Sequence, residues 1–326
     1  MATSKESTKQ LPPIENAKRL AAYRAVKDHF PHDARYVGIG SGSTVVYVVE
    51  AIAALGRDVT SKMTFVPTGS QSKQLIIEAR FNLGSIDTLL PQGEEVEERP
   101  DGSEDITKKG TMHVATGKQD LGQKDARLML DVSFDGADEV DDDLNCIKGG
   151  GACLFLEKLV AINAKKFICV ADQRKLRPRL LTTWPTIPIE VAPLSAPSVI
   201  KTLHSLGSSD PRLRLGTPGK AGPLVTDNGL YIIDAPFPTL LLPTDKKSEG
   251  KWEVHELGQR LKEIVGVFEV GLFSGYNGIE AEKNEDAGGA QKPVAAYFGM
   301  EDGSVTVLAA EGKEGVRRYS LQANEL

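Results

Sequence analysis

The amino-acid sequence predicts an α/β protein with a Rossmann-like parallel-sheet large domain and a smaller ferredoxin-like α+β domain. Two observations support this prediction: strand and helix patterns alternate along the first half of the chain, and a β-α-β-β-α-β order follows in the second half. Alternation of this kind is typical of a parallel sheet with helices on both faces. A length of 326 residues accommodates one large or two ordinary domains.

The first half begins with a helical pattern from Ile14 to His29, which Pro31 ends. An apolar run at 36–39 predicts a strand, and apolar spacing at 45–55 predicts a helix after a glycine turn. Further alternation predicts strands at 63–66, 128–134 and 167–171 and helices at 74–81 and 153–165. Residues 93–124 are polar and lack periodicity, which predicts a surface insertion.

From Trp184 onward proline is frequent and the patterns change. The predicted order there is that of a ferredoxin-like domain, with strands at 187–191, 213–215, 231–233 and 267–273 and helices at 198–206 and 254–264. Asp-Asn-Gly at 227–229 predicts a hairpin turn. Strands at 295–299 and 305–309 are expected to return to the first sheet. We therefore predict a large domain of residues 1–183 and 265–326 and a small domain of residues 184–264.

Composition restricts the partners and the compartment. A net charge of −6 argues against a nucleic-acid partner, although a few lysines in one cleft can still attract a small anion. The three cysteines form no CxxC pair, and so low a count indicates a reducing compartment. No apolar run approaches the roughly 18 residues of a membrane span, and no secretory signal is recognised. We expect a cytoplasmic protein without a membrane partner.

The first motif that could bind a ligand lies on a predicted strand-to-helix turn. It reads Gly38-Ile39-Gly40-Ser41-Gly42-Ser43-Thr44. Glycines allow close approach of an anion, and a helix N-terminus offers unpaired N–H groups. The dinucleotide fingerprint is incomplete, because Ser43 stands where a third glycine is required. No lysine precedes Ser43 or Thr44, so the ATP-type loop is also absent. A monophosphate is the simplest ligand for this turn.

A second motif, Asp135-Gly136-Ala137-Asp138-Glu139, directly follows a predicted strand. Ligand sites lie at the carboxyl ends of strands in such sheets. Asp135 and Asp138 could therefore face one pocket, raise each other's pKa and move protons between hydroxyl groups. A solvated acidic turn is the alternative, since we expect the following run at 141–143 to be exposed. A calcium site is a further alternative, although the EF-hand pattern does not match.

The third motif is Lys148-Gly149-Gly150-Gly151, which leads into an apolar helix that carries Glu157. Three successive glycines are costly unless the backbone must approach something closely. A carboxylate partly removed from water on that helix would have a raised pKa and could act as a base. The alternative is an exposed glutamate beside Lys158.

Two lysines are weaker candidates for phosphate binding when each is considered alone. Lys175 follows a predicted strand within Ala171-Asp172-Gln173-Arg174-Lys175-Leu176 and could reach a phosphate. Lys18 lies in the first predicted helix. A solvated side chain is the ordinary interpretation of either.

Together these segments resemble the A-type ribose-5-phosphate isomerase family. The similarity consists of six motifs in order: GIGSGST, DGADEVD, KGGGACLFLEK, ADQRKL, VTDNGLYIID and GVFEVGLF. It extends over most of residues 16–308, apart from the polar insertions. The resemblance implies interconversion of D-ribose 5-phosphate and D-ribulose 5-phosphate in the pentose phosphate pathway. It also implies no metal, no organic cofactor, and a homodimer or homotetramer.

The resemblance also implies roles for individual residues. Glu157 resembles the base that moves a proton between two carbons of an enediolate. Asp135 resembles the carboxylate that assists ring opening, with Asp138 holding hydroxyls beside it. Lys148 and the N–H groups of the glycine run would stabilise the oxyanion. The residues that resemble phosphate and hydroxyl ligands are Lys18, Ser41, Gly42, Ser43, Thr44, Gly149, Gly150, Gly151 and Lys175.

The chain departs from the family pattern in a few places. Leu156 stands where an arginine often precedes the glutamate, which removes a cation beside Glu157 and favours a more basic carboxylate. Gln173 and Arg174 replace an acidic residue and a serine before Lys175. The insertion at 93–124 is longer than usual, and others are predicted near 243–251 and 282–292.

Two rival functions deserve comparison with isomerisation. A sugar-phosphate sensor of the same fold would regulate transcription, but it would carry a helix-turn-helix and a basic face, and it would not need Glu157 as a base. A dinucleotide-dependent dehydrogenase conflicts with the incomplete glycine fingerprint.

Overall fold

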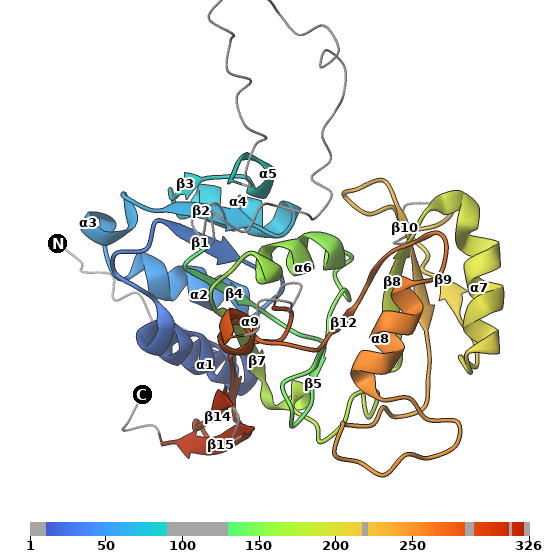
Figure 1. The fold of residues 1–326 in the computed structure, drawn as a ribbon. Coiled ribbons are helices and arrows are strands. Elements are labelled where there is room, and N and C mark those ends of the chain that lie inside the picture. Colours follow the sequence, from blue (N-terminus) through green and yellow to red (C-terminus); the bar gives the residue numbers. More distant parts are fainter. Residues whose placement is uncertain (1–10, 90–129, 217–220, 284–289, 313–314, 323–326) are drawn as a thin grey trace, which may run out of the picture.

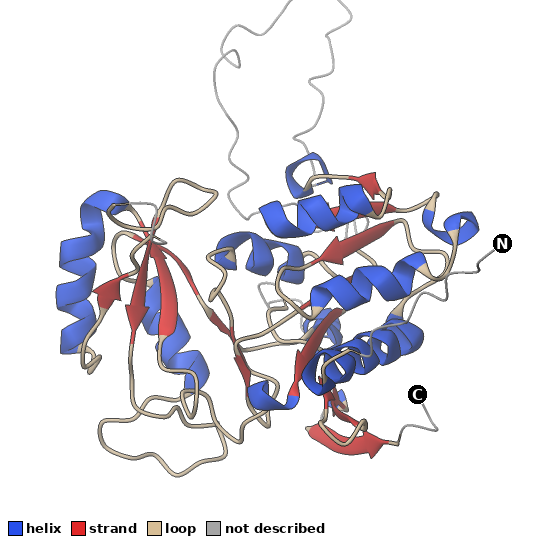
Figure 2. Ribbon diagram, turned by 180° about the vertical axis from the view of Figure 1, so that it is seen from behind, coloured by secondary structure: helices blue, strands red, loops and turns tan. Residues whose placement is uncertain are grey.

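The computed structural model describes residues 11–89, 130–216, 221–283, 290–312 and 315–322. The predicted insertion at 93–124 lies outside these residues, as does most of the one at 282–292. Figure 1 shows a large lobe and a small lobe side by side, and Figure 2 shows the same two lobes from behind. Each lobe is built on a sheet of its own.

Eight strands form the sheet of the large lobe. In chain order they are β1 (Tyr36–Ile39), β2 (Thr64–Pro67), β3 (Asn82–Leu83), β4 (Val132–Asp135), β7 (Phe167–Asp172), β13 (Ala295–Gly299), β14 (Val305–Ala310) and β15 (Val316–Leu321). Their order in space is β15-β14-β13-β7-β4-β1-β2-β3. The strands from β13 to β3 run parallel, and β14 and β15 are antiparallel additions at one edge.

Helices cover both faces of this sheet. They are α1 (Pro13–His29), α2 (Val45–Ala53), α3 (Arg57–Thr60), α4 (Ser70–Glu78), α5 (Ile86–Leu89), α6 (Leu154–Ile162) and α9 (Gly278–Lys283). Alternating side chains of β7 explain the two faces, because neighbours along a strand point in opposite directions. Ile168 and Val170 join the core beneath α1 and α2, whereas Cys169 joins the opposite core with Ala161 of α6.

Helix α1 approaches the sheet unusually closely. The predicted helix is confirmed, but its most buried stripe consists of small residues, Ala17, Ala21, Ala22 and Ala25, rather than the larger apolar ones. A Cβ on Gly299 of β13 would lie 1.9 Å from the Ala17 carbonyl oxygen. Small side chains on both elements therefore allow this contact.

The small lobe follows the predicted β-α-β-β-α-β order. Its elements are β8 (Ile187–Val191), α7 (Ala196–Ser205), β9 (Arg212–Leu213), β10 (Tyr231–Ala235), α8 (Val254–Lys262) and β11 (Val267–Val270), with a short 3-10 helix at Pro193–Ser195. The antiparallel strand order β11-β8-β10-β9 is ferredoxin-like. Side chains of both helices pack with β8 and β10 in one core. The predicted fold class is confirmed.

The strand predicted at 267–273 is two strands. Its first part is β11 of the small sheet, and its second part, β12 (Leu272–Phe273), joins a third sheet with β5 (Glu139–Val140) and β6 (Cys146–Ile147). Gly271 separates them, where a Cβ would lie 2.3 Å from the Lys148 carbonyl oxygen. The domain boundaries stay a prediction, and because β11 pairs with β8 we propose the second boundary after Val270 rather than after residue 264.

Candidate active site

A cavity of about 450 Å³ lies beyond the carboxyl ends of β1, β4 and β7, on the side where α6 begins. This is the position at which doubly wound sheets bind their ligands. It is lined by Ser41, Gly42, Ser43, Thr44, Ser70, Gln71, Gly136, Ala137, Asp138, Lys148, Gly149, Gly150, Gly151, Cys153, Glu157, Val170, Ala171, Asp172, Arg174, Lys175 and Asp227. The three numbered motifs of the sequence analysis and the segment around Lys175 therefore all contribute to one cavity.

The turn after β1 is shaped for close approach of a ligand. A Cβ on Gly40 would lie 1.9 Å from Asp135 Oδ1, so only glycine fits beside that carboxylate. Gly42 has a φ of +106°, which favours glycine. Thr44 precedes α2 without a capping side-chain hydrogen bond, which leaves backbone N–H groups at the start of that helix for a ligand.

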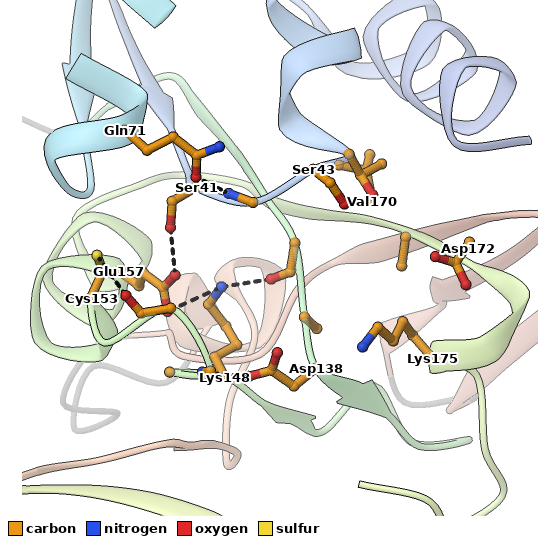
Figure 3. A pocket seen from close by; sticks show the side chains of 18 of the residues that line it. Ser41, Ser43, Gln71, Asp138, Lys148, Cys153, Glu157, Val170, Asp172 and Lys175 are labelled. Atoms are coloured by element: carbon orange, nitrogen blue, oxygen red, sulfur yellow. Dashed lines mark hydrogen bonds and ion pairs between the residues drawn. The ribbon is translucent and has the colours of Figure 1, made fainter. Parts of the chain in front are cut away.

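Cations lie on the same side of the cavity as this turn. Lys18 is buried behind the lining and donates from Nζ to Ser43 Oγ at 3.0 Å and to Glu15 Oε1 at 2.7 Å. Lys175 lines the cavity, with its Nζ 4.9 Å from the Trp184 ring centroid. In Figure 3, Ser43, Asp172 and Lys175 occupy one side of the cavity, whereas Lys148 and Glu157 occupy the other.

On the other side, Lys148 connects two buried carboxylates. Its Nζ lies 3.0 Å from Asp135 Oδ2 and 3.4 Å from Glu157 Oε2, and it donates to the Gly136 carbonyl oxygen at 2.6 Å. The three residues are 2%, 3% and 6% exposed, respectively. Ser41 Oγ donates to the other carboxylate oxygen of Glu157 at 3.1 Å. Asp135 Oδ2 and Glu157 Oε2 face the lysine without an aligned hydrogen bond.

Burial sets the proton affinities of this group. It raises the pKa of Glu157 to about 7, although the charge of Lys148 opposes the shift. It also raises the pKa of Asp135, again against Lys148. Burial alone would lower the pKa of Lys148, but the charges of Asp135 and Glu157 outweigh it and raise that pKa. Lys148 therefore stays protonated, and Glu157 can exchange a proton near neutral pH.

The glycine run forms the floor between the two sides. Gly149 has a φ of +99°, and the Gly150 N–H donates to Asp138 Oδ2 at 2.7 Å. A Cβ on Gly150 would lie 2.6 Å from Asp138 Oδ1, so the backbone approaches this carboxylate as closely as glycine allows. Burial raises the pKa of Asp138 more than any other influence.

Two expectations about the acidic motif need correction. Asp135 and Asp138 do not act mainly on each other, since burial is the largest influence on both, and Asp135 lies behind the cavity lining. Asp141 is fully buried rather than exposed, because its carboxylate accepts hydrogen bonds from the backbone and side chain of Asn145. Its loop folds inward around that carboxylate.

Three residues that line the cavity were not identified as site residues from the sequence: Ser70, Gln71 and Asp227. Gln71 Oε1 accepts from the Gly42 N–H at 2.9 Å, and Ser70 Oγ donates to Asp227 Oδ2 at 3.1 Å. Ser70 and Gln71 begin α4, separated by two residues from the end of β2, whose parallel pairing with β1 brings its end to the same sheet edge. That position was an available signal. Asp227 comes from the small lobe; its segment was recognised as a hairpin turn within a family motif, but its contact with Ser70 depends on how the two lobes meet.

Among the described residues, no group of three or more His, Cys, Asp or Glu side chains could hold a metal ion. No described helix is long and apolar enough to cross a membrane.

Comparison with known proteins gives a consistent result. A family model described as ribose 5-phosphate isomerase A (phosphoriboisomerase A) matches residues 108–281. The ribose-5-phosphate isomerase of Schizosaccharomyces pombe is 42% identical over 314 residues, covering 96% of this chain and 90% of that protein. The ribose-5-phosphate isomerase of Candida albicans is 41% identical over 299 residues, covering 90% of this chain and 96% of that protein.

Solved structures extend the comparison to the fold. A D-ribose-5-phosphate isomerase in complex with phospho-erythronic acid has a TM-score of 0.64 and 29% identity, covering 94% of this chain and 99% of that one. Ribose 5-phosphate isomerase A of Methanocaldococcus jannaschii has a TM-score of 0.62 and 26% identity, with the same coverage. The chain therefore belongs to the ribose 5-phosphate isomerase A family, whose members interconvert ribose 5-phosphate and ribulose 5-phosphate.

Proposed function

We propose that Glu157 is the base of this isomerisation and that the reaction passes through an enediolate. The observation that carries the proposal is a buried carboxylate at the cavity wall whose pKa is raised to about 7. Such a group accepts a proton in one step and returns it in the next at neutral pH. Glu157 takes the proton from C2 of the open-chain aldose and delivers it to C1, while a hydroxyl proton moves from O2 to O1.

The two sides of the cavity orient the substrate. The phosphate binds the turn Ser41–Thr44, where hydroxyls and free helix N–H groups meet the charges of Lys18 and Lys175. The carbons that react then lie across the cavity beside Glu157 and Lys148. A phosphate bound at one side holds C1 and C2 near the base, so binding energy is used for positioning.

The remaining polar groups stabilise the negative charge that develops on the substrate and bind its hydroxyl groups. Lys148 and the Gly151 N–H stabilise the enediolate oxygen, as preorganised donors do in other oxyanion sites. Asp138, which is held by the Gly150 N–H at the floor of the cavity, accepts hydrogen bonds from substrate hydroxyl groups. Asp135 assists ring opening through Lys148, because it lies behind the lining and pairs with that lysine.

The direct test is proton NMR on chelator-treated, cofactor-free protein with ribose 5-phosphate in heavy water. Ribulose 5-phosphate with deuterium at C1 supports an enediolate formed without metal or cofactor. Complete internal return of the proton would give ketose without label. A chain that binds the sugar phosphate but forms no ketose would instead be a sensor, which would leave the buried carboxylate of Glu157 without a role.

Binding offers a second test. A solved relative is in complex with phospho-erythronic acid, a sugar acid that carries both a phosphate and a carboxylate. We therefore expect this chain to bind phospho-erythronic acid competitively with ribose 5-phosphate. A homodimer or homotetramer in the cytoplasm, which family membership favours, is part of the same proposal, and light scattering on the purified protein measures its mass.

A further inference from the structure

The glycine run is held from behind by an arginine of the small lobe. Arg214, next to β9, donates from Nη1 to the carbonyl oxygens of Gly149 at 2.9 Å and of Gly150 at 3.0 Å. Arg214 is not part of the cavity lining, and no sequence motif singled it out. Its guanidinium therefore contacts the back of the loop whose front faces the ligand.

A carbonyl contact on one side fixes an N–H on the other. Peptide units are planar and trans, so the C=O of one residue and the N–H of the next point in opposite directions. Holding the Gly149 carbonyl directs the Gly150 N–H toward Asp138, which it meets at 2.7 Å. Holding the Gly150 carbonyl directs the Gly151 N–H to the same side, and among the described residues that N–H donates to no acceptor.

Arg214 is itself fixed by an ion pair. Its Nε and Nη2 donate to the two carboxylate oxygens of Asp234 in β10, at 2.8 and 2.6 Å. Paired contacts of this kind fix the plane of a guanidinium, and a lysine cannot reproduce them. The side chains are 17% and 27% exposed. By contrast, Arg212 of β9 pairs with Asp210 at side-chain exposures of 77% and 55%.

We propose that Arg214, fixed by Asp234, is a positioning residue for the isomerisation: it holds two carbonyls of the glycine run so that the Gly150 N–H fixes Asp138 and the Gly151 N–H is presented to the cavity. The proposal builds on the function given above, in which Asp138 holds substrate hydroxyls and the Gly151 N–H stabilises the enediolate oxygen. It assigns the small lobe a part in the chemistry without contact to the substrate.

The test compares Arg214→Met with the unaltered chain in three measurements. We expect kcat to fall about tenfold or more, because displaced oxyanion donors reduce transition-state stabilisation. Affinity for phospho-erythronic acid should fall by a similar factor, because we expect its carboxylate to meet the same Gly151 N–H and its hydroxyls to meet Asp138. The inhibition constant of inorganic phosphate, which needs only the Ser41–Thr44 side, should change less than about twofold. A merely structural role would weaken all ligands together.

Matched variants make the result decisive. Arg212→Met removes the exposed arginine of the adjoining strand β9 and should leave all three values unchanged. If Arg214→Met does not fold, Asp234→Asn keeps the shape but removes the charge, and we expect the same pattern at smaller size. The proposal is overturned if a folded Arg214→Met, or Asp234→Asn in its place, keeps kcat and phospho-erythronic acid affinity within about twofold. Equal loss of phosphate affinity would overturn it too. The comparison of phospho-erythronic acid with phosphate affinity requires no turnover. It therefore tests the role of Arg214 even if the proposed catalytic role of Glu157 is wrong.

Discussion

Helix α6 carries neighbouring residues that serve two different regions. Glu157 faces the cavity beside Lys148, whereas Lys158 faces the seam between the lobes. Lys158 Nζ donates to Glu269 Oε1 and to the carbonyl oxygens of Val270 and Leu272, at 2.9, 2.6 and 2.9 Å. An ammonium has three donors, and here all three are used. At the cavity, by contrast, two carboxylate oxygens that face Lys148 lack an aligned hydrogen bond.

Glu139 extends the comparison to a second glutamate. Its buried carboxylate accepts from the backbone N–H groups of Leu181, Thr182, Thr183 and Trp184, and from the Thr183 hydroxyl. It thereby anchors the chain where it leaves the large lobe for the small one. Glu157 is also buried, but it accepts only one aligned hydrogen bond from the described residues, from Ser41. Satisfied buried charges hold structure, and incompletely satisfied ones at a cavity remain available for proton transfer.

Glu157→Gln should have the largest effect, a fall in kcat on the order of a hundredfold or more, because the amide cannot accept the proton. Phosphate affinity should persist. Since the pKa of Glu157 is raised from its ordinary 4.5 to about 7, its ionisation lowers the stability of the fold as pH rises through that window. The variant should therefore be no less stable than the unaltered chain at pH 8, by urea denaturation. Near-normal kcat would remove Glu157 from the role of base.

Lys148→Met should reduce kcat by on the order of a hundredfold, because a charged donor to the enediolate oxygen is lost. The charge of Lys148 lowers the pKa of Glu157, so without it the pKa should rise and the pH at which kcat reaches half its maximum should increase. The pH dependence of kcat measures this shift. An unchanged pH profile would mean that the charge of Lys148 does not influence the pKa of the catalytic base.

Lys158→Met is the matched control for Lys148, since both lysines are buried and paired. It should lower the free energy of unfolding by about 2–3 kcal/mol, less than the full cost of breaking a buried pair. Glu269 keeps a second partner, Lys262, at 2.9 Å, which moderates the loss. We expect kcat of the folded variant to stay within about threefold. A hundredfold loss of kcat with normal stability would contradict the division between seam and cavity.

Glu139→Gln is the matched control for Glu157→Gln and should have the smallest effect. The NH2 of the glutamine amide would replace one acceptor oxygen and would face backbone N–H groups of residues 181–184. The loss of these hydrogen bonds should cost about 1–2 kcal/mol of unfolding free energy. Urea denaturation measures the loss, and kcat should be retained. If kcat fell as far as in Glu157→Gln, burial alone would not distinguish the two glutamates.

Much of this division could be predicted from the sequence, because local patterns specify local structure. Glycine turns after strands located the Ser41–Thr44 turn and the Gly149–Gly151 run, and parallel pairing brought them to one edge. The burial of Asp141 and Glu139 could not be predicted, because their partners are backbone groups of irregular loops. Nor could the contacts of Asp227 and Arg214, which depend on how the small lobe sits against the large one.

The most direct test of the central claim is a carbon-13 NMR titration of the ligand-free protein labelled at glutamate carboxyl groups. Ligand-free protein avoids the second ionisation of a phosphate, which occurs near pH 6. We predict one glutamate carboxyl that titrates near pH 7 and is missing from Glu157→Gln. If every glutamate carboxyl titrated below about pH 5, as ordinary glutamates do, Glu157 would not be a base poised for proton transfer at neutral pH.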